Sequence, residues 1–313
     1  MADVKKIATR EGYGNALKEL AEEFPQMVVL DADLAAATKT SIFRKAYPDR
    51  HIDCGIAESN MMGVAAGLSL TGMIPFVSSF AMFAAGRAFE QVRNSIGYPH
   101  LNVKIGATHA GITVGEDGAS HQCNEDIALM RTIPGMVVMC PSDEVEAKAC
   151  VRAALEHEGP VYIRFGRAPV PVINDRPDYK FEIGKGTVVR EGSDVTIVAS
   201  GICVDSALGA AEMLAADGIN AEVINICTIK PLDEEIIINS AKKTGKVVTV
   251  EEHSVIGGLG SAVCDCLSEK LPTPVKKIGM YDVFGESGSA AALVKKYGLD
   301  AEGVYKSVKE YMA

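Results

Sequence analysis

The segment ESNMMGVAAGLSLTGMIPFV, residues 58–77, indicates the fold class of this chain. Residues 58–69 are mostly small or apolar, which predicts a helix that is buried on nearly every side. Residues 74–77, Ile-Pro-Phe-Val, are the next strand candidate. A buried helix followed closely by a buried strand is typical of a parallel α/β sheet.

The same alternation of helix and strand signals extends outward on both sides of this segment. The elements predicted in the first half are helices at 9–24, at about 80–96 and from 142 onward, and strands at 27–30, 101–105, 135–140 and 161–164. Those predicted in the second half are strands at 194–199, 221–226 and 246–250 and a helix at 205–217. This alternation predicts an α/β fold.

A change in composition divides the chain in two. Prolines 169, 171 and 177 lie close together, which is typical of a segment that crosses between domains. We therefore predict two α/β domains, with a mainly parallel sheet in the first. Their predicted bounds are residues 1–170, a linker at 171–186, and a smaller α/β domain at 187–313.

Composition and charge exclude several classes of function. The 313 residues are 48% hydrophobic and 23% charged, which is typical of a globular protein. The net charge of −10 comes without a basic stripe, so we expect no nucleic-acid partner, although a local group of Arg, His or backbone N–H can still bind an anion. The N-terminus lacks an apolar signal core and no apolar run approaches membrane-spanning length, so we expect no membrane partner.

Eight cysteines are scattered along the chain, most of them in apolar stretches where a free Cys acts as a small hydrophobic residue. Reduced thiols predict a cytoplasmic protein. The only close pair, Cys264 and Cys266, has neither a second pair nor a nearby His. We therefore expect no metal site within this chain.

The loop Gly257-Gly-Leu-Gly260 follows a strand and precedes an apolar helix, an arrangement that is also used to bind phosphate. It lacks the full dinucleotide fingerprint, and the strand before it ends in acids. We favour a tight turn between strand and helix, with a nucleotide site as the alternative.

Glu58 begins the apolar helix of the opening segment. A carboxylate at this position can simply stabilise the helix dipole. The residues around it predict a more buried setting, and a desolvated carboxyl group tends to hold a proton near neutral pH. Such a group can donate a hydrogen bond to a ring nitrogen.

Two phenylalanines, Phe80 and Phe83, follow the strand at 74–77 in a chain that has nine Phe and no Trp. Their spacing is equally typical of an ordinary helix core. The functional alternative is a flat apolar wall for an aromatic ligand.

His109 and His121 flank a loop that contains three glycines, Gly111, Gly115 and Gly118. A histidine is more often a core residue, but glycine-rich loops lie at the surface, where binding and catalysis concentrate. In that setting the two histidines can donate hydrogen bonds to an anion or shuttle protons.

Taken together, these segments resemble the transketolase family. The resemblance rests on an ordered set of motifs that covers essentially the whole chain: Gly55-Ile-Ala-Glu58, Ser79-Phe-Ala-Met-Phe83, Gly115-Glu-Asp-Gly118, Ser120-His-Gln122, Ile133-Pro, Pro141-Ser-Asp143, Ile163-Arg-Phe-Gly-Arg167 and Val250–Ser261. It implies that the first domain binds the aminopyrimidine of thiamine diphosphate. The second domain then corresponds to the C-terminal domain of the family.

The resemblance implies cofactor roles for four residues. Glu58 hydrogen-bonds N1′ of the aminopyrimidine, whose exocyclic nitrogen then deprotonates the thiazolium carbon that attacks a ketose. Phe80 and Phe83 form the pocket that holds the pyrimidine. Asp33 lies near the thiazolium.

It also implies substrate roles for four residues. His109 and His121 bind substrate hydroxyls and shuttle protons, and Asp117 binds a further hydroxyl. Arg167 grips the sugar phosphate, a task that suits a guanidinium fork.

Two departures from the family pattern matter. Ala37 stands where larger members often carry a phosphate-binding Ser, so this contact passes to Thr38 or is lost. No Gly-Asp-Gly segment for Mg²⁺ and diphosphate occurs. The resemblance therefore implies one chain of a split transketolase, whose N-terminal partner subunit holds the diphosphate and Mg²⁺, with a homodimer core inside a heterotetramer.

The implied activity is transfer of a two-carbon ketol unit between sugar phosphates, as in the pentose phosphate pathway. One alternative is the β-subunit of a 2-oxoacid dehydrogenase, which has no evident use for two loop histidines. Another is an enzyme similar to deoxyxylulose-phosphate synthase, which normally carries all its domains in one chain. A non-catalytic binding or regulatory homologue is the alternative of another class, and it has no physical need for the combined acid, aromatic and histidine set.

Overall fold

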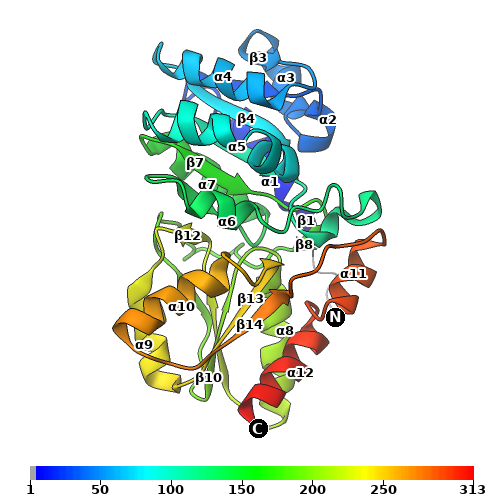
Figure 1. Ribbon diagram of the computed structural model, residues 1–313, viewed down its shortest axis with the longest axis vertical. Coiled ribbons are helices and arrows are strands. Elements are labelled where there is room, and N and C mark those ends of the chain that lie inside the picture. Colours follow the sequence, from blue (N-terminus) through cyan, green and yellow to red (C-terminus); the bar gives the residue numbers. More distant parts are fainter. Residues whose placement is uncertain (1–4) are drawn as a thin grey trace.

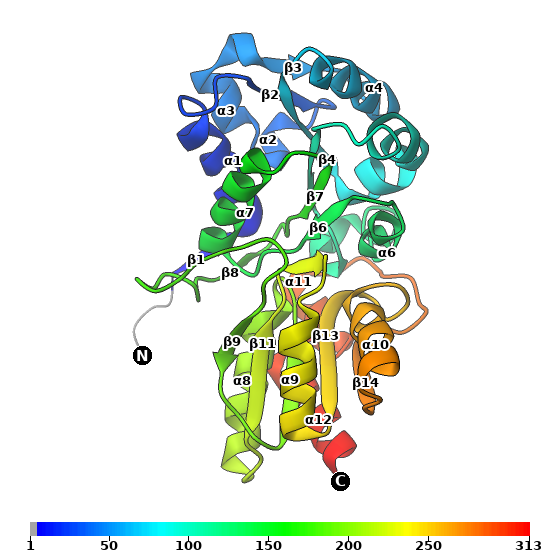
Figure 2. The ribbon, with the colours of Figure 1, turned by 90° about the vertical axis from the view of Figure 1, so that its left-hand side faces the viewer.

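The computed structural model describes residues 5–313, which form two α/β units stacked along the long axis of the molecule (Figure 1). The predicted fold class of two α/β domains is confirmed. A small antiparallel pair, β1 (Lys6–Ala8) with β8 (Pro169–Pro171), lies at the junction of the units (Figure 2). No helix within this range is long and apolar enough to cross a membrane.

The first unit is built on a seven-stranded sheet in the order β12-β6-β7-β5-β4-β2-β3. Its strands are β2 (Met27–Asp31), β3 (His51–Asp53), β4 (Ile74–Phe80), β5 (Lys104–Thr108), β6 (Val137–Met139), β7 (Val161–Arg164) and β12 (Thr228–Lys230). Every pairing is parallel except that of β12 with β6. The carboxyl ends of the parallel strands therefore lie along one edge.

Helices cover both faces of this sheet. On one face lie α1 (Thr9–Leu20), α3 (Ser41–Ala46) and α7 (Glu144–Glu156), in the apolar cluster that contains Phe76. On the other lie α4 (Glu58–Ser69), α6 (Asp126–Arg131) and the helical segment 82–97, in the cluster that contains Val77. Successive side chains of a strand point to opposite faces, so a strand covered on both sides becomes a continuous apolar run. Two short helical turns, α2 (Ala35–Thr38) and Pro48–Arg50, lie among the connections.

The second unit has a five-stranded sheet in the order β14-β13-β10-β11-β9. Its strands are β9 (Thr187–Arg190), β10 (Val195–Ala199), β11 (Ala221–Asn225), β13 (Val247–Ser254) and β14 (Val275–Met280), of which β9 is antiparallel to its neighbour. One face packs with α8 (Cys203–Ala216), α11 (Ala290–Lys296) and α12 (Ala301–Met312). The other packs with α9 (Glu234–Thr244) and α10 (Leu259–Lys270), which share one apolar cluster with the first unit.

Helix α4 has the bounds that the opening segment predicts, but the prediction of burial on nearly every side is wrong. Asn60, Gly63 and Gly67 are exposed, whereas Met61 is fully buried against the sheet. The exposed positions themselves are Asn or Gly, whereas Val64 and Leu68 on the same side of the helix are half-buried.

The helix predicted at about 80–96 is not a regular α-helix. Strand β4 continues to Phe80, and two π-helical stretches, Met82–Arg87 and Val92–Gly97, flank the short α5 (Phe89–Gln91). Such π turns occur frequently at functional sites. The first of them carries Phe83 and Arg87.

Many elements had no predicted counterpart, among them β3, α3, α6, β9, β12, α9, β14, α11 and α12. Strand β13 also runs beyond the predicted end at residue 250, as far as Ser254. Strand β12 belongs to the second half of the sequence but pairs with β6 of the first sheet. The second half of the chain therefore contributes an edge strand to the first unit.

Candidate active site

The residues predicted to carry chemistry collect at the carboxyl edge of the first sheet. Phe80 ends β4, His109 follows β5 and Arg167 follows β7, and these strands are parallel neighbours. Glu58 begins α4 shortly after β3, the last strand of the same sheet. Ligands of open α/β sheets bind in crevices outside this kind of edge.

Glu58 is 1% exposed, so its predicted burial is confirmed. Its Oε2 accepts a hydrogen bond of 3.0 Å from Nη1 of Arg87, whose side chain is 54% exposed. The guanidinium and the N-terminus of α4 both place positive potential at the buried carboxyl group. The interpretation of Glu58 as an acid held only by apolar surroundings was therefore incomplete, because Arg87 compensates its burial.

Phe80 and Phe83 form an aromatic wall beside this pair. Their rings are nearly parallel, at 15°, with centroids 6.1 Å apart. The guanidinium carbon of Arg87 lies 4.8 Å from the centroid of Phe83, within the range of a cation–π contact. Arg87 thus connects the buried acid to the aromatic wall.

His109 stacks on the same wall. It has a positive φ of 55°, and its ring centroid lies 3.8 Å from that of Phe80. Nε2 accepts a hydrogen bond from Arg10 at 3.1 Å, which places the ring proton on Nδ1, where it is donated to the hydroxyl of Thr108 at 2.9 Å. Burial, and then the charges of Arg10 and Arg167, lower the pKa of His109 to about 3. The ring is therefore neutral near pH 7.

His121 completes the aromatic cluster. Its ring meets Phe83 edge-on with centroids 5.4 Å apart and lies 6.4 Å from Phe80. Its Nδ1 pairs with the hydroxyl of Ser120 at 2.9 Å, which leaves Nε2 for a ligand. The structure thus brings together Phe80, Phe83, His109 and His121, which were predicted separately. Below we call these four residues the aromatic cluster.

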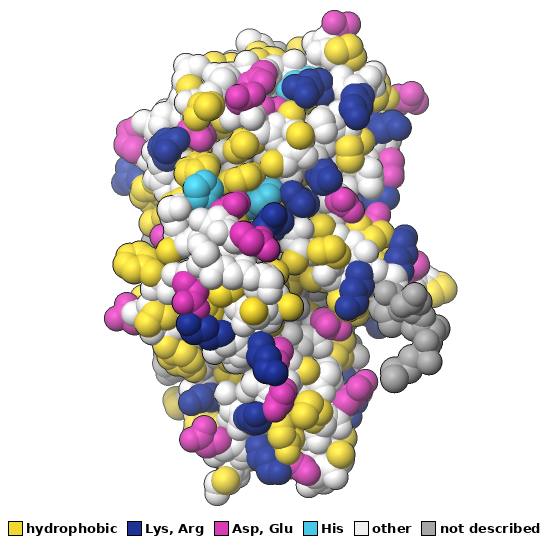
Figure 3. Space-filling model, turned by 90° about the vertical axis from the view of Figure 1, so that its right-hand side faces the viewer, with side chains coloured by type: hydrophobic (Ala, Val, Ile, Leu, Met, Phe, Trp, Pro, Cys, Tyr) yellow, Lys and Arg dark blue, Asp and Glu magenta, His cyan; other side chains and the backbone are white. Residues whose placement is uncertain are grey.

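Three basic side chains, Arg10, Lys39 and Arg167, lie near the aromatic cluster. The charge of each lowers the pKa of His109, an effect that falls with distance. Arg167 also donates to Oε2 of Glu116 at 2.9 Å. Figure 3 shows histidine side chains beside a group of Lys and Arg on one face of the molecule. The predicted Arg167 is thus accompanied by Arg10 and Lys39, which belong to no motif and become neighbours only through folding.

The two predicted aspartates lie at the surface of the same edge. Asp117 is exposed in the helical turns at 112–117. Asp33 follows β2 with a φ of 60° and is exposed, and its backbone N–H donates to Oδ1 of Asp53 at 3.1 Å. Neither carboxylate is buried among the residues of the aromatic cluster.

The hydroxyl of Thr38 is not available to replace the phosphate-binding serine expected at position 37. The Thr38 side chain is fully buried, and its hydroxyl donates to the carbonyl of Leu34 and pairs with the hydroxyl of Thr40, each at 3.0 Å. The carbonyl of Ala37 instead accepts a hydrogen bond from Arg10 at 2.8 Å. Arg10 is therefore the cationic group at this position.

In the glycine-rich loop of the second unit, a side chain of the protein accepts backbone N–H groups that a phosphate could otherwise bind. Both carboxylate oxygens of Glu251 accept backbone N–H bonds at the start of α10, from Leu259 at 2.7 Å and from Gly260 at 2.8 Å. A carboxylate thus takes the place in which a helix N-terminus would bind a phosphate. The geometry favours the tight turn over the nucleotide site.

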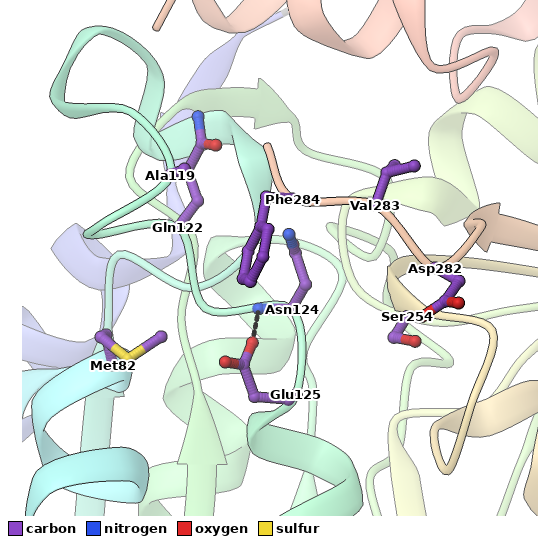
Figure 4. Close-up of a pocket in the computed structure, with 9 residues that line it drawn as sticks. All are labelled: Met82, Ala119, Gln122, Asn124, Glu125, Ser254, Asp282, Val283 and Phe284. Carbon is purple, nitrogen blue, oxygen red and sulfur yellow. Dashed lines mark hydrogen bonds between the residues drawn. The ribbon is translucent and has the colours of Figure 1, made fainter. Parts of the chain in front are cut away.

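A cavity of about 290 Å³ lies between the two units, and Figure 4 shows the side chains that line it. Met82 and Gln122 line it from the first unit, and Ser254 and Phe284 line it from the second. Met82 precedes Phe83 in the chain and Gln122 follows His121, so the cavity adjoins the candidate site.

The aromatic cluster and Glu58 together fit the aminopyrimidine half of a thiamine cofactor. A buried carboxyl group can pair with a ring nitrogen, and parallel phenyl rings can hold a flat heterocycle. No group of three or more His, Cys, Asp or Glu suited to a metal ion occurs within residues 5–313.

Comparison with known protein families gives an independent assignment. The family described as transketolase, pyrimidine binding domain, matches residues 5–172, and the transketolase C-terminal domain matches residues 184–304. The chain belongs to the transketolase family.

Some relatives match this chain over nearly their whole length, whereas others, such as human transketolase, are about twice as long, since the match covers 49% of that protein. A Methanocaldococcus jannaschii protein, provisionally named a transketolase C-terminal section, is 52% identical over 305 residues, which are 97% of this chain and 96% of that one. A 6-deoxy-6-sulfo-D-fructose transketolase subunit of Clostridium sp. (strain MSTE9) is 48% identical over 301 residues, 96% of this chain and 93% of the relative. A solved structure described as a split gene transketolase, inactive beta4 tetramer, is 57% identical, with a TM-score of 0.90 over 98% of this chain and 99% of the other.

Proposed function

We propose that this chain is one subunit of a thiamine-diphosphate-dependent transketolase, which transfers a two-carbon ketol unit between sugar phosphates. The observation that carries the proposal is the buried carboxyl group of Glu58, linked through Arg87 to the aromatic cluster. Relatives of similar length are named as a C-terminal section and as a subunit of such enzymes, which supports a split enzyme.

The first domain contributes the pyrimidine pocket. When bound, thiamine diphosphate supplies the thiazolium carbon that takes up the two-carbon unit. Glu58 would hydrogen-bond N1′ of the aminopyrimidine, while Phe80 and Phe83 would orient the ring and exclude water. Asp33 would approach the thiazolium end of the cofactor.

The loop between His109 and His121 contributes the substrate contacts. The ring of His121 hydrogen-bonds through Nδ1 to Ser120, and among the described residues Nε2 has no recorded hydrogen-bond partner, so Nε2 takes the proton-shuttle role. His109 is neutral, and its ring nitrogens are paired with Arg10 and Thr108, so it contacts the sugar by exchanging its hydrogen bond with Arg10 and does not act as an acid. Asp117, exposed on the same loop, binds a further hydroxyl.

The anionic end of the sugar binds to Arg167, Arg10 and Lys39. Nε of Arg10 is buried and has no hydrogen-bond partner among the described residues, which suits a site that an anion completes. Guanidinium groups recognise the oxygens of an anion and not its central atom. The Clostridium relative is named for a sulfonated sugar, so we take the terminal group to be a phosphate or a sulfonate.

The remaining parts of the proposal concern the assembly. We assign the diphosphate and Mg²⁺ to an N-terminal transketolase subunit, paired with this chain in a heterotetramer around a homodimer core. We divide this chain into a pyrimidine-binding domain at 1–170, a linker at 171–186 and a C-terminal domain at 187–313, and we place the enzyme in the cytoplasm, in the pentose phosphate pathway.

Reconstitution tests the proposal. We expect no ketol transfer from the purified chain with thiamine diphosphate and Mg²⁺, and robust transfer once the N-terminal subunit is added. Parallel assays with ketose phosphates and sulfonated ketoses identify the terminal group. Activity of the chain alone would contradict the split-subunit assignment, and an inactive complex on every ketose would contradict the transketolase activity.

A further inference from the structure

The loop that carries Asp117 and His121, residues 111–122, is anchored in the second domain and not only in the first. Ile112 is fully buried in the apolar cluster of the second domain, among side chains that include Ile197 of β10 and Val250 of β13. A residue of the candidate substrate loop therefore forms part of the core of the other domain. Below we call residues 111–122 the substrate loop.

Glu252, at the carboxyl end of β13, holds the backbone of this loop. Its Oε1 accepts the N–H of Thr113 at 2.6 Å, and its side chain is almost completely buried. Gly111 has a φ of 73°, and a methyl group there would overlap the Glu252 carboxyl group. Arg164 donates to the carbonyls of Glu252 at 2.8 Å and of Cys123 at 3.2 Å, so the end of the loop is tied to the same strand.

A second attachment comes from the segment 281–289, which follows β14 (Figure 4). Nε2 of Gln122 donates to the carbonyl of Glu286 in this segment at 2.9 Å, and to the carbonyl of Ile112 at 3.2 Å within the loop. Gly115, with a φ of 84°, leaves room for the carbonyl of Gly288. The loop is therefore hydrogen-bonded at its start and at its end to groups of the second domain, and its middle lies close to Gly288 of that domain.

We propose that the second domain positions the substrate loop, and that Glu252 is the positioning residue that fixes its start. Glu252 acts through Thr113 and Gly111 and not on the sugar itself. The kinetic part of this proposal rests on the proposed transketolase function; the structural part does not.

Hydrogen exchange on the isolated chain tests the structural part. Glu252→Ala leaves the Thr113 N–H without its acceptor, so amides of the substrate loop should exchange at least about tenfold faster than in the wild type, as for a segment that opens locally. Glu252→Gln keeps an acceptor oxygen and should retain most of the protection.

Glu222→Ala is the matched control. Glu222 is a fully buried glutamate of β11 in the same domain, and it accepts a hydrogen bond from Thr196 at 3.4 Å and pairs with Lys243. Its loss should destabilise the second domain without changing exchange in the substrate loop. Unchanged exchange in Glu252→Ala, or equal acceleration in Glu222→Ala, would overturn the positioning role.

Kinetics of the complex with the N-terminal subunit test the functional part. Glu252→Ala should lower kcat/KM for the sugar by about tenfold or more and leave the apparent affinity for thiamine diphosphate within about twofold, because Glu58 and Phe83 do not depend on this contact. Equal losses for sugar and cofactor would mean a merely structural role and overturn the claim. An inactive wild-type complex would refute the proposed function. The hydrogen-exchange experiment would still show whether Glu252 positions the substrate loop.

Gly111→Ala tests the same contact from the loop side and stands in if Glu252→Ala does not fold. Its added methyl group meets the Glu252 carboxyl group and is strained at a φ of 73°. We expect the same pattern of faster loop exchange and impaired sugar turnover with near-normal cofactor affinity. Wild-type behaviour of this variant would contradict the proposal.

Discussion

The carboxyl edges of the two sheets have the same architecture but use their polar residues in opposite ways. At the first edge, Glu58 pairs with the half-exposed Arg87, and His121 keeps one ring nitrogen for a ligand. At the second edge, Glu251 accepts N–H groups of its own α10, and Glu252 accepts the N–H of Thr113. An acid at the end of a parallel strand is therefore weak evidence for a site. The stronger evidence is hydrogen-bonding capacity that the protein's own backbone does not use.

The difference also gives the physical reason for favouring a tight turn over a nucleotide site at Gly257–Gly260. The N-terminus of α10 offers backbone N–H groups of the kind that bind phosphate. Glu251 already satisfies two of them, so a second anion would meet its negative charge. At α4, by contrast, the acid is the first residue of the helix and Arg87 approaches it from outside.

Of the substitutions at the two edges, Glu58→Gln should reduce activity most. The amide keeps the shape of the side chain but cannot hold and release the proton at pyrimidine N1′. We expect kcat of the reconstituted complex to fall about 10²–10⁴-fold, the usual size of an acid–base contribution. Far-UV circular dichroism and the Tm should stay close to the wild type.

Glu251→Gln is the control for that experiment, because Glu251 is also a buried glutamate at a helix N-terminus. It should retain ketol transfer within about twofold, since it contacts only its own domain. Equal losses of activity in the two variants would contradict the claim that Glu58 serves catalysis and Glu251 serves only stability.

Glu251→Ala should act on stability instead. The N–H groups of Leu259 and Gly260 lose their acceptor, and a buried donor left unsatisfied costs about 1–3 kcal/mol. We expect the free energy of unfolding in urea to fall by about 3 kcal/mol in total. An unchanged unfolding midpoint would show that water or another group replaces the carboxylate.

Arg167→Ala should raise KM for phosphorylated sugars by about 10–100-fold, the range expected for a lost charged hydrogen bond. Unphosphorylated sugars should change far less. Glu116→Gln should act in the opposite direction, because Glu116 competes for the same guanidinium. An exposed ion pair contributes at most about 1 kcal/mol, so we expect a decrease in KM of up to about fivefold. Equal effects on both classes of sugar would contradict the assignment of Arg167.

Sequence reasoning predicted the fold class because buried parallel strands are short apolar runs between helices. Strand β12 was not predicted, because Thr228-Ile-Lys230 has a single apolar residue and its partner β6 lies far away in the sequence. The two π-helical stretches were not predicted either, because the apolar spacing from 80 to 96 fits a regular helix equally well.

The candidate site was predictable where its residues belong to short motifs, as with Glu58, Phe80 and Phe83. The residues that hold it together were not. Arg10 reaches His109 across 99 positions, and Glu252 reaches Thr113 across 139. Such contacts depend on how the domains pack, and no local periodicity reports them.

His109 should produce the smallest effect, a dependence of stability on pH. Its folded pKa of about 3 lies below the ordinary value of 6.5, so the fold favours the neutral ring. Stability is complete above pH 6.5 and is lost as the pH falls toward 3, because the unfolded chain then binds a proton that the folded chain does not. Between pH 7 and 5.5 the loss should be about 1 kcal/mol.

Urea unfolding of the wild type and of His109→Gln isolates this effect, since the glutamine offers an acceptor to Arg10 but does not titrate. Other groups titrate alike in both proteins, so the difference between their unfolding free energies should change by about 1 kcal/mol from pH 7 to 5.5. Parallel curves would mean that His109 takes up a proton in the folded state. Arg10 could then no longer donate to Nε2, and the first edge would present an imidazolium to its ligand instead of a neutral ring.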